Sequence, residues 1–371
     1  FMASQSSAAA TQTQSDQTQS DQTQSDQTQS DQTQSDQTQA AQTQATNHTA
    51  SISWQEWNAE SFEQAQREQK FILLDLVAVW CHWCHVMDAK TYADPQVQAL
   101  IEQHYVAVQA DHDARPDLAE RYRRWGWPAT IVLTPDGREI VKRAGYIAPE
   151  GMAKLLQAIV DDPSPERQRG LLPTTFSDSP QLHANTRKTL LQRHVDSFDP
   201  ELGGLKINQK FVDADTVEYD LQQARQGDTA AAIRARKTLD AGLALIDPAF
   251  GGAYQYSIFG DWQHPDYEKI VLSQARYLRL YAQAAQLFNE PAYRQAVNDV
   301  LRYVDDFLTA PNGAFYTSQD ADVTQGERAH DYFALNRQQR LAIGIPRVDQ
   351  HQYSYHNGLL IEALSEAYRA L

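Results

Sequence analysis

Two cysteines, the only ones in the chain, stand three residues apart in the stretch FILLDLVAVWCHWCHVM. Cys81 and Cys84 are each followed by a histidine, His82 and His85, and a lone aspartate, Asp75, interrupts the apolar run just before them. Thiols at this spacing can form a reversible disulfide, attach a haem or contribute ligands to zinc. They can also be inert side chains packed in a core. The surrounding sequence must therefore distinguish between these possibilities.

The apolar run that precedes the cysteines predicts a buried strand, and the residues after Cys81 predict a helix. A helix N-terminus carries partial positive charge, which favours a thiolate, so we expect an exposed Cys81 to act as the nucleophile. Cys84, almost one turn further, would resolve the mixed disulfide, and charged His82 and His85 would stabilise the thiolate further. Burial raises the pKa of a carboxylate, so Asp75 is predicted to deprotonate Cys84 through water, although it could instead satisfy nearby polar groups.

A proline just before a later strand makes the pattern more specific. The sequence RWGWPATIVL sets Pro128 where a cis-proline can hold a backbone segment against a dithiol. The tryptophans near the cysteines and near this proline predict an aromatic rim that binds an extended peptide or a small disulfide; they are Trp80, Trp83, Trp125 and Trp127.

Three other interpretations of the cysteine pair stay open. Cys-x-x-Cys-His also fits haem attachment, but the strand before it and Pro128 after it favour a dithiol. Zinc requires four ligands, and the chain has no second Cys/His cluster, although His104 and His112 could approach. Inert cysteines in a binding module are the third interpretation. We assign no metal site and no cofactor.

Charge and composition exclude several classes of protein. The 371 residues carry a formal charge of −16, which argues against nucleic acid as a main partner because such binding needs a basic face. The longest apolar run falls short of the roughly 18 residues that span a membrane. Residues 1–50 contain five copies of Ser-Asp-Gln-Thr-Gln, a composition that predicts a disordered tail.

The order of predicted elements indicates an α/β layer fold over residues 51–162. A helix containing Ser61 as N-cap is followed by the strand Phe71–Trp80, a helix from Cys81, and a second strand at His104–Asp111. After a further helix, the segment Ala129–Tyr146 reads as a hairpin that turns at Pro-Asp-Gly, and a helix from Pro149 to about Val160 completes the unit.

A polar, proline-rich stretch at residues 163–176 predicts a linker to an all-α domain at 177–371. Alanine- and leucine-rich segments predict six helices there, over residues 181–197, 214–226, 229–246, 267–288, 291–308 and 353–370. The loops FDPELGG and IDPAFGG recur 48 residues apart, and TAPNGAFY is a looser third copy. This repetition suggests a helical array or toroid.

The spacing of Asp75, Trp80-Cys81-x-x-Cys84 and Trp127-Pro128 resembles the thioredoxin fold, in which Pro128 would be the cis-proline. The longer string beginning CHWCHVM and continuing through Arg115-Pro116-Asp117 resembles a narrower family, the thioredoxin-domain proteins related to spermatogenesis-associated protein 20. The match extends from about Trp54 to Tyr146. It implies a redox-active dithiol with Cys81 attacking and Cys84 resolving.

The helical segment is similar to that family's α/α-toroid, a relative of six-hairpin glycosidases and sugar epimerases. The motifs that carry the likeness include HPDYEKIVLSQA, GAFYTSQDAD and HNGLLIEAL, with departures at Asp266-Tyr267 and at His356. Fewer helices are predicted than a closed toroid needs, so we expect an incomplete toroid. Carboxylates beside aromatic residues suit a sugar pocket, and the candidates are Asp266, Glu268, Asp320 and Asp322. Acidic loop caps and aromatic core at helix ends explain the same residues, and the sequence favours this ordinary interpretation.

The sequence therefore predicts a thiol–disulfide oxidoreductase that acts on protein or small-molecule thiols and disulfides and exchanges electrons with an upstream redox partner. The alternative is a carbohydrate-binding or carbohydrate-modifying α/α domain that carries a regulatory thioredoxin-like module. We expect no nucleic-acid partner and no membrane span. The first residue is not Met and the tail resembles a tether, which favours an extracytoplasmic location over the cytoplasm.

Overall fold

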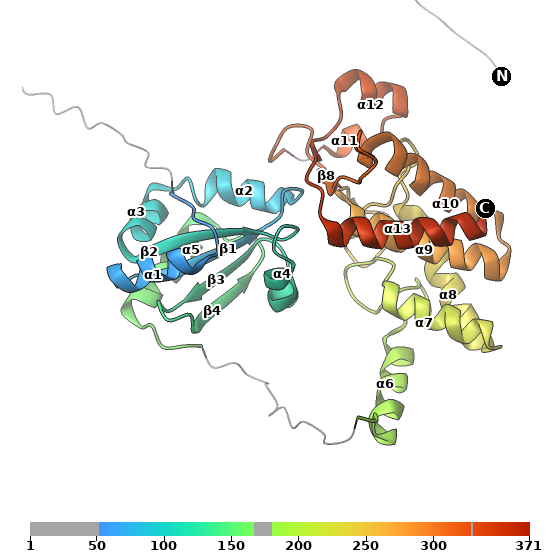
Figure 1. Ribbon diagram of the computed structural model, residues 1–371, viewed down its shortest axis with the longest axis horizontal. Helices are drawn as coiled ribbons and strands as arrows, with labels where there is room; N and C mark the ends of the chain where they lie inside the picture. The colour runs from blue at the N-terminus through green and yellow to red at the C-terminus, as the bar shows by residue number, and fades with distance from the viewer. Residues whose placement is uncertain (1–51, 167–179, 328) are drawn as a thin grey trace, which may run out of the picture. The chain divides into compact units, whose positions relative to one another are not determined.

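The computed structural model describes residues 52–166, 180–327 and 329–371 (Figure 1). The predicted disordered tail and most of the predicted linker lie outside these residues. Residues Thr49–Leu371 form one compact unit, so the boundary between an α/β domain and a helical domain stays a prediction. Within the described residues, no helix is both long enough and apolar enough to cross a membrane.

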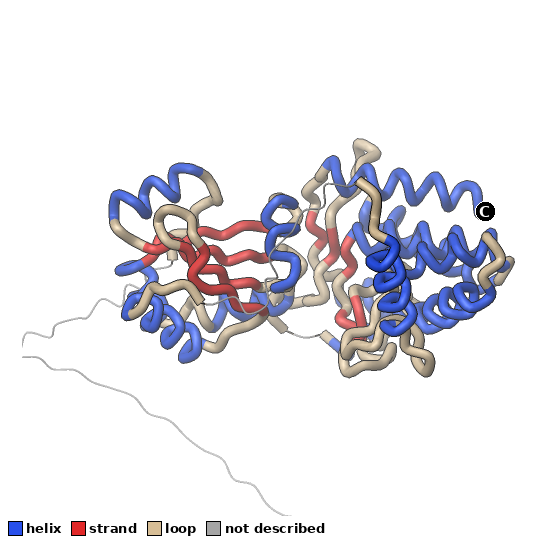
Figure 2. The backbone as a smooth tube through the Cα atoms, turned by 90° about the horizontal axis from the view of Figure 1, so that it is seen from below, coloured by secondary structure: helices blue, strands red, loops and turns tan. Residues whose placement is uncertain are grey.

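The α/β region is built on a four-stranded sheet with the order β2-β1-β3-β4. The central strand β1 (Phe71–Val77) runs parallel to β2 (Tyr105–Asp111) and antiparallel to β3 (Ala129–Leu133). Strand β4 (Glu139–Ala144) pairs with β3 across the predicted hairpin. Figure 2 shows these strands in red.

Helices cover both faces of this sheet because alternate side chains of a strand point to opposite sides. Leu73 packs in a cluster with residues of α2, α3 and α5, whereas Leu74 packs with residues of α1 and α4. The bounds are α1 Ala59–Glu68, α2 His82–Lys90, α3 Pro95–His104, α4 Pro116–Tyr122 and α5 Pro149–Asp161, with a short 3₁₀ turn at Arg123–Trp125. The predicted thioredoxin-like fold is confirmed.

The expected N-cap of the first helix is wrong by three residues. Asn58 caps α1 because its side-chain oxygen accepts a hydrogen bond from the backbone N–H of Ser61 at 3.1 Å. Ser61 lies inside the helix, and its hydroxyl donates to the carbonyl oxygen of Glu56. Two good capping residues stand close together in the sequence, and only backbone geometry selects between them.

The C-terminal region is mainly helical, as predicted, and its likeness to an α/α-toroid stays a prediction. Its helices are α6 Ala184–Ser197, α7 Ala214–Arg225, α8 Thr229–Gly242, α9 Val271–Phe288, α10 Pro291–Tyr303, α11 His330–Phe333, α12 Arg337–Ile343 and α13 Ser354–Ala370. Helix α9 was expected to begin near Tyr267, but Pro265–Asp266 and Lys269–Ile270 form the short strands β6 and β7. Strand β7 belongs to a three-stranded sheet with β8 (Ser318–Gln319) and β9 (Val348–Asp349).

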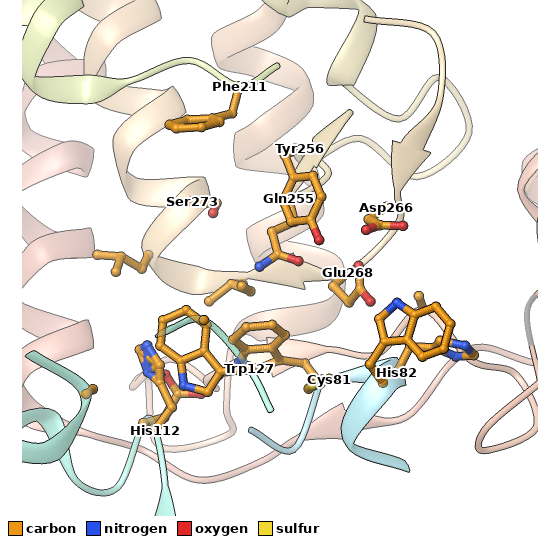
Figure 3. A pocket seen from close by; sticks show the side chains of 18 of the residues that line it. Cys81, His82, His112, Trp127, Phe211, Gln255, Tyr256, Asp266, Glu268 and Ser273 are labelled. Atoms are coloured by element: carbon orange, nitrogen blue, oxygen red, sulfur yellow. Dashed lines mark hydrogen bonds and ion pairs between the residues drawn. The ribbon is translucent and has the colours of Figure 1, made fainter. Parts of the chain in front are cut away.

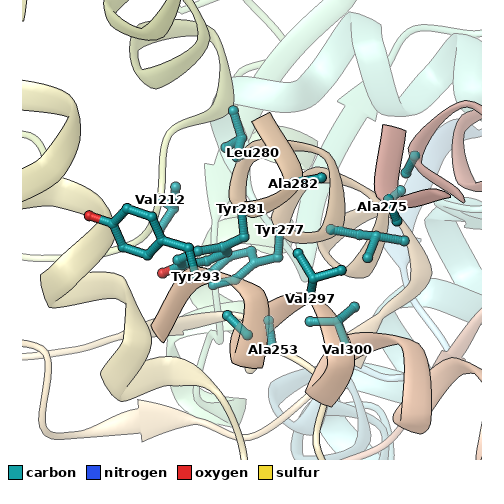
Figure 4. Packing of buried hydrophobic residues seen from close by; sticks show 14 of the residues in the cluster. Val212, Ala253, Ala275, Tyr277, Leu280, Tyr281, Ala282, Tyr293, Val297 and Val300 are labelled. Atoms are coloured by element: carbon teal, nitrogen blue, oxygen red, sulfur yellow. The ribbon is translucent and has the colours of Figure 1, made fainter. Parts of the chain in front are cut away.

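Helix α9 forms the centre of the helical core and is contacted by α7, α10 and α13. Tyr277 and Tyr281 of α9 are buried against Tyr293 and Val297 of α10 (Figure 4). A helix that is apolar on most of its circumference is stable only where other helices surround it, which is the position that α9 occupies.

The repeated Asp-Pro…Gly-Gly loops are equivalent structural corners. In the first, Lys210 donates to Asp199 at 2.6 Å, and in the second, Lys269 donates to Asp247 at 2.6 Å. Gly252 has a φ of 75°, and a Cβ at this residue would lie 2.5 Å from the ring of Tyr303. Glycine is therefore required there both by the left-handed backbone and by close packing.

Candidate functional site

The dithiol lies where β1 gives way to α2. Cys81 is the N-cap of α2, and the backbone N–H of Cys84 donates to the Sγ of Cys81 at 3.1 Å. The two cysteines form a disulfide. Since the first N–H groups of a helix point at its N-cap, a thiolate at Cys81 would be stabilised by the helix dipole and by this donor.

Cys81 is buried, which corrects the expectation of an exposed sulfur. Only 4% of Cys81 and 2% of Cys84 are accessible to solvent. Both pack in one apolar cluster with Trp80 and with Ile270 and Leu272 of the helical region. The residues that cover the dithiol are far away in the sequence, so the local pattern of strand, cysteines and helix did not reveal them.

A cavity of about 1040 Å³ opens beside Cys81 (Figure 3). Its lining includes Trp80, Trp83 and Trp127 from the α/β region and Tyr256 and Glu268 from the helical region. The predicted aromatic rim is therefore part of the wall of a cavity beside a buried sulfur rather than a ring around an exposed one. Trp83 is 40% exposed, whereas Trp80 is buried. Trp125 also lines the cavity.

A polar group that the sequence analysis missed orients Trp80. The indole N–H of Trp80 donates to Asp113 at 3.0 Å, and burial raises the pKa of this carboxyl to about 7. His112 lies against the ring of Trp127 with 4.2 Å between ring centroids, and burial lowers its pKa to about 4. His356 lies 3.5 Å from Asp113. No sequence signal marks Asp113, because it follows β2 in an ordinary acidic loop.

The two histidines that follow the cysteines face carboxylates of the helical region. The Nδ1 atom of His82 lies 2.8 Å from Asp322, and the Nδ1 atom of His85 lies 3.5 Å from Asp322 and 3.7 Å from Asp320. Burial alone lowers the pKa of His85, but these two carboxylates outweigh it and raise the pKa above its ordinary value. A role for His82 and His85 in tuning the Cys81 thiolate stays a prediction.

Asp75 lies on the face of the sheet that α2 covers, because it shares the parity of Leu73 along β1. Its Oδ2 atom accepts a hydrogen bond from Gln109 at 3.1 Å, and its Oδ1 atom is buried with no hydrogen-bond partner in the described structure. Burial, together with the charge of Asp88 on α2, raises its pKa to about 7. Such a group exchanges protons readily near neutral pH.

Replacing Asp75 with asparagine should stabilise the protein increasingly as pH rises. The folded-state pKa of about 7 exceeds the ordinary 3.8, so the folded state holds a proton that the unfolded state has lost between these values. Stability of the wild type therefore falls as pH rises from about 4 to 7, by at most about 4 kcal/mol. Asp88 and Tyr92 are the titratable groups that influence Asp75.

Urea unfolding of the wild type and of Asp75→Asn at pH 4, 6 and 8 measures this effect. The two proteins should differ little at pH 4 and most at pH 8, where the variant is the more stable. Asp161→Asn is the control, because Asp161 is an exposed carboxylate at the end of α5 and is not among the groups that influence Asp75. A stability difference that does not change with pH would contradict the assignment.

The Trp127–Pro128 peptide bond is cis, as the sequence predicted. The carbonyl oxygen of Pro128 accepts a hydrogen bond from the backbone N–H of Gly145, which joins the start of β3 to the end of β4. Trp127 lines the cavity beside Cys81 (Figure 3). Positioning of a substrate backbone by Pro128 and Trp127 stays a prediction.

Three of the four carboxylates predicted for sugar chemistry lie at the dithiol, and the fourth, Asp320, faces His85. Asp266, Glu268 and Asp322 line the same cavity as Cys81. Glu268 is buried, its Oε2 atom has no hydrogen-bond partner within the described residues, and burial raises its pKa to about 8. A protonated Glu268 can donate a hydrogen bond to a polar ligand. The sequence placed these residues and the dithiol in separate sites, whereas the fold brings them together.

Comparison with known proteins agrees with this geometry. A family model named Thioredox_DsbH and described as "Protein of unknown function, DUF255" matches residues 36–167. Thioredoxin H-type of Fagopyrum esculentum is 31% identical over 103 residues, which cover 27% of this chain and 82% of the plant protein. The chain belongs to the thioredoxin family.

The likeness to spermatogenesis-associated protein 20 is also confirmed. The Mus musculus protein of that name is 25% identical over 308 residues, or 73% of this chain. The chain spans only about two-fifths of that relative's length, since the match covers 39% of it. Among solved structures, a family 76 glycoside hydrolase from a bovine Bacteroides thetaiotaomicron strain aligns with 42% of this chain and 30% of its own, at 17% identity and a TM-score of 0.32.

Proposed function

We propose that this protein is a thiol–disulfide oxidoreductase whose Cys81–Cys84 pair, at the N-terminus of α2 (the redox helix), acts on substrates bound in the cavity beside Cys81. The observation that carries this proposal is the disulfide at the N-terminus of α2, with Cys81 in the wall of a cavity of about 1040 Å³. A disulfide that served only as a structural cross-link would have no need of an adjoining ligand-sized space.

In the reducing direction, the Cys81 thiolate attacks one sulfur of a substrate disulfide. The substrate S–S bond breaks, a mixed disulfide forms, and the first substrate sulfur leaves and takes up a proton from solvent. Cys84 then gives up its proton, for which Asp75 is the proposed acceptor, and attacks Cys81. The second substrate thiol is released, so the substrate gains two electrons and the Cys81–Cys84 pair loses two.

The cycle requires a second dithiol or disulfide as the upstream redox partner. In the reducing direction, a dithiol donor reduces the Cys81–Cys84 disulfide after each turnover. In the oxidising direction, a disulfide acceptor re-forms the Cys81–Cys84 disulfide. All the steps are thiol–disulfide exchanges, so the reduction potential of the pair relative to its partners decides the direction.

The burial of Cys81 restricts the substrate class. A disulfide held on the surface of a folded protein would have to displace the packing of Ile270 and Leu272 to reach the sulfur. A small-molecule disulfide or an extended peptide segment can enter the cavity instead. Trp80, Trp83 and Trp127 offer apolar contact there, while Glu268 offers a polar one.

Equilibration of the whole chain in glutathione redox buffers tests the proposed function. After rapid alkylation, mass spectrometry should show one reversible transition between two free thiols and none, because the chain contains only these two cysteines. The same transition should be reached from the oxidised and from the reduced protein. A pair that stays oxidised at every glutathione ratio, or that fails to re-form, would exclude the proposal.

A further inference from the structure

Three buried side chains converge at a point beside the redox helix. His85 of α2 faces Asp320 and Asp322, which follow β8 in the helical region. One ligand atom from each of these residues lies within 4.8 Å of the other two, and all three residues are buried. The Nδ1 atom of His85 is 3.5 Å from an oxygen of Asp322 and 3.7 Å from an oxygen of Asp320.

The tautomer of a neutral His85 is fixed by its other nitrogen. The Nε2 atom lies 3.0 Å from the carbonyl oxygen of Val79, which can only accept, so Nε2 carries a hydrogen. The Nδ1 atom is buried with no hydrogen-bond partner in the described structure, and the side chain is 7% exposed. The Nδ1 atom thus faces two carboxylates across gaps of 3.5 and 3.7 Å. Either a proton on Nδ1 or a cation held between the three side chains compensates the negative charge there.

The carboxylates are oriented by groups around them. Asp322 lies 2.8 Å from the Nδ1 atom of His82 and accepts from the backbone N–H of Gly326 at 2.8 Å. One oxygen of Asp320 accepts from the backbone N–H of Asp322 at 3.0 Å, and its other oxygen faces His85. Metal ligands in proteins are typically held in this way, with the second nitrogen of a histidine on a backbone carbonyl and each carboxylate hydrogen-bonded.

We propose that His85, Asp320 and Asp322 bind a divalent transition-metal ion, with zinc as the best-matched candidate. Ligand atoms around tetrahedral zinc lie about 3.3–3.4 Å apart, given bonds of 2.0–2.1 Å. The nitrogen–oxygen distances of 3.5 and 3.7 Å need only a small contraction to reach this geometry. One imidazole and two carboxylates leave a coordination position for water or a ligand, and their charge neutralises the ion.

The ligands of this site differ from those of the zinc site weighed from the sequence, in which Cys81 and Cys84 would bind the ion. It also gives the histidine after Cys84 a function of its own. Because His85 is on α2 and the two aspartates follow β8, a bound ion would link the redox helix to the helical region. The proposal holds whether or not the dithiol is catalytic.

Zinc titration of the whole, disulfide-bonded chain by isothermal calorimetry tests the site, since the oxidised cysteines cannot supply thiolates. We expect saturable binding of one zinc ion per chain and a rise in the thermal unfolding midpoint with zinc. His85→Gln and Asp320→Asn should each weaken the affinity at least about 10-fold. Cobalt(II) should give a visible absorption spectrum of low-coordinate nitrogen and oxygen ligation.

His264→Gln is the matched control, because His264 also lies beside a carboxylate, Asp261 at 2.8 Å, but is exposed. This variant should bind zinc as the wild type does. Circular dichroism confirms that each variant is folded, and Asp320→Asn preserves the shape of the side chain. The proposal fails if the oxidised wild type shows no saturable zinc binding. That result would indicate that a proton on His85, rather than a metal ion, compensates the two carboxylates. The proposal also fails if both ligand variants bind zinc with unchanged affinity.

Discussion

Replacing Cys81 with serine should abolish thiol–disulfide exchange, lowering its rate by at least about 100-fold, because a hydroxyl at neutral pH is far less nucleophilic than a thiol. Cys84→Ser should have a different effect. It keeps the attacking sulfur at the N-terminus of α2 but removes the sulfur that resolves the mixed disulfide. This variant should therefore accumulate a stable adduct with a disulfide substrate.

The chain is well suited to this comparison because each variant contains a single thiol. Incubation with cystamine or oxidised glutathione, followed by intact-mass spectrometry, should show one adduct per chain for Cys84→Ser. Cys81→Ser should react at least about 10-fold more slowly, since Cys84 lies inside α2 and does not line the cavity beside Cys81. The double variant, with no thiol, is the control for non-specific mass changes.

Equal adduct formation by the two single variants would show that position at the helix N-terminus confers no reactivity on Cys81. A small disulfide and an unfolded peptide disulfide should both react with Cys84→Ser. A disulfide on a folded protein should react much more slowly, because Cys81 is only 4% exposed. Faster reaction with the folded protein than with cystamine would contradict a substrate-sized cavity.

The elements of the α/β region were predicted well because each is recognised from a short stretch of sequence. A continuous apolar run predicted β1, which is buried at five consecutive positions, and the Pro-Asp-Gly turn predicted the hairpin of β3 and β4. Asp75 was visible as a charged residue in an apolar strand, and Pro128 as a proline before one. Each of these features depends on residues a few positions apart.

The features that the sequence did not predict depend on pairs that are distant along the chain. His82 and Asp322 are separated by 240 residues, and nothing local to either one indicates that they meet. The covering of Cys81 by Ile270 has the same origin. The sequence predicts a helix where the two-residue strand β7 lies, because so short a segment shows no alternation of polar and apolar residues.

The Asp-Pro…Gly-Gly repeat was visible in the sequence, but the structure shows why its aspartates matter. Asp247 is fully buried and accepts from Lys269 at 2.6 Å and from Arg340 at 2.7 Å. Lys269 and Arg340 are also almost fully buried, at 1% and 0% exposure. One carboxylate thus balances two cations in the interior. Burial alone would raise the pKa of Asp247, but Lys269 and Arg340 outweigh it and keep this pKa below the ordinary value.

Replacing Asp247 with asparagine should destabilise the helical region by about 3–5 kcal/mol, because it leaves two buried cations without their counterion. Urea unfolding at neutral pH measures this loss. Asp199→Asn is the matched control from the first repeat, since Asp199 also pairs with a buried lysine, Lys210, but its side chain is 16% exposed. Water can compensate there, so the control should lose less than half as much stability.

A second substitution separates unpaired charge from general damage at this corner. Adding Lys269→Met to Asp247→Asn removes one of the two uncompensated cations, and should restore part of the lost stability even though it deletes a further hydrogen-bonding group. If the double variant is less stable than Asp247→Asn, the corner is held by its hydrogen-bond network rather than by charge balance. The Asp247 carboxylate would then act mainly as an acceptor for Lys269 and Arg340.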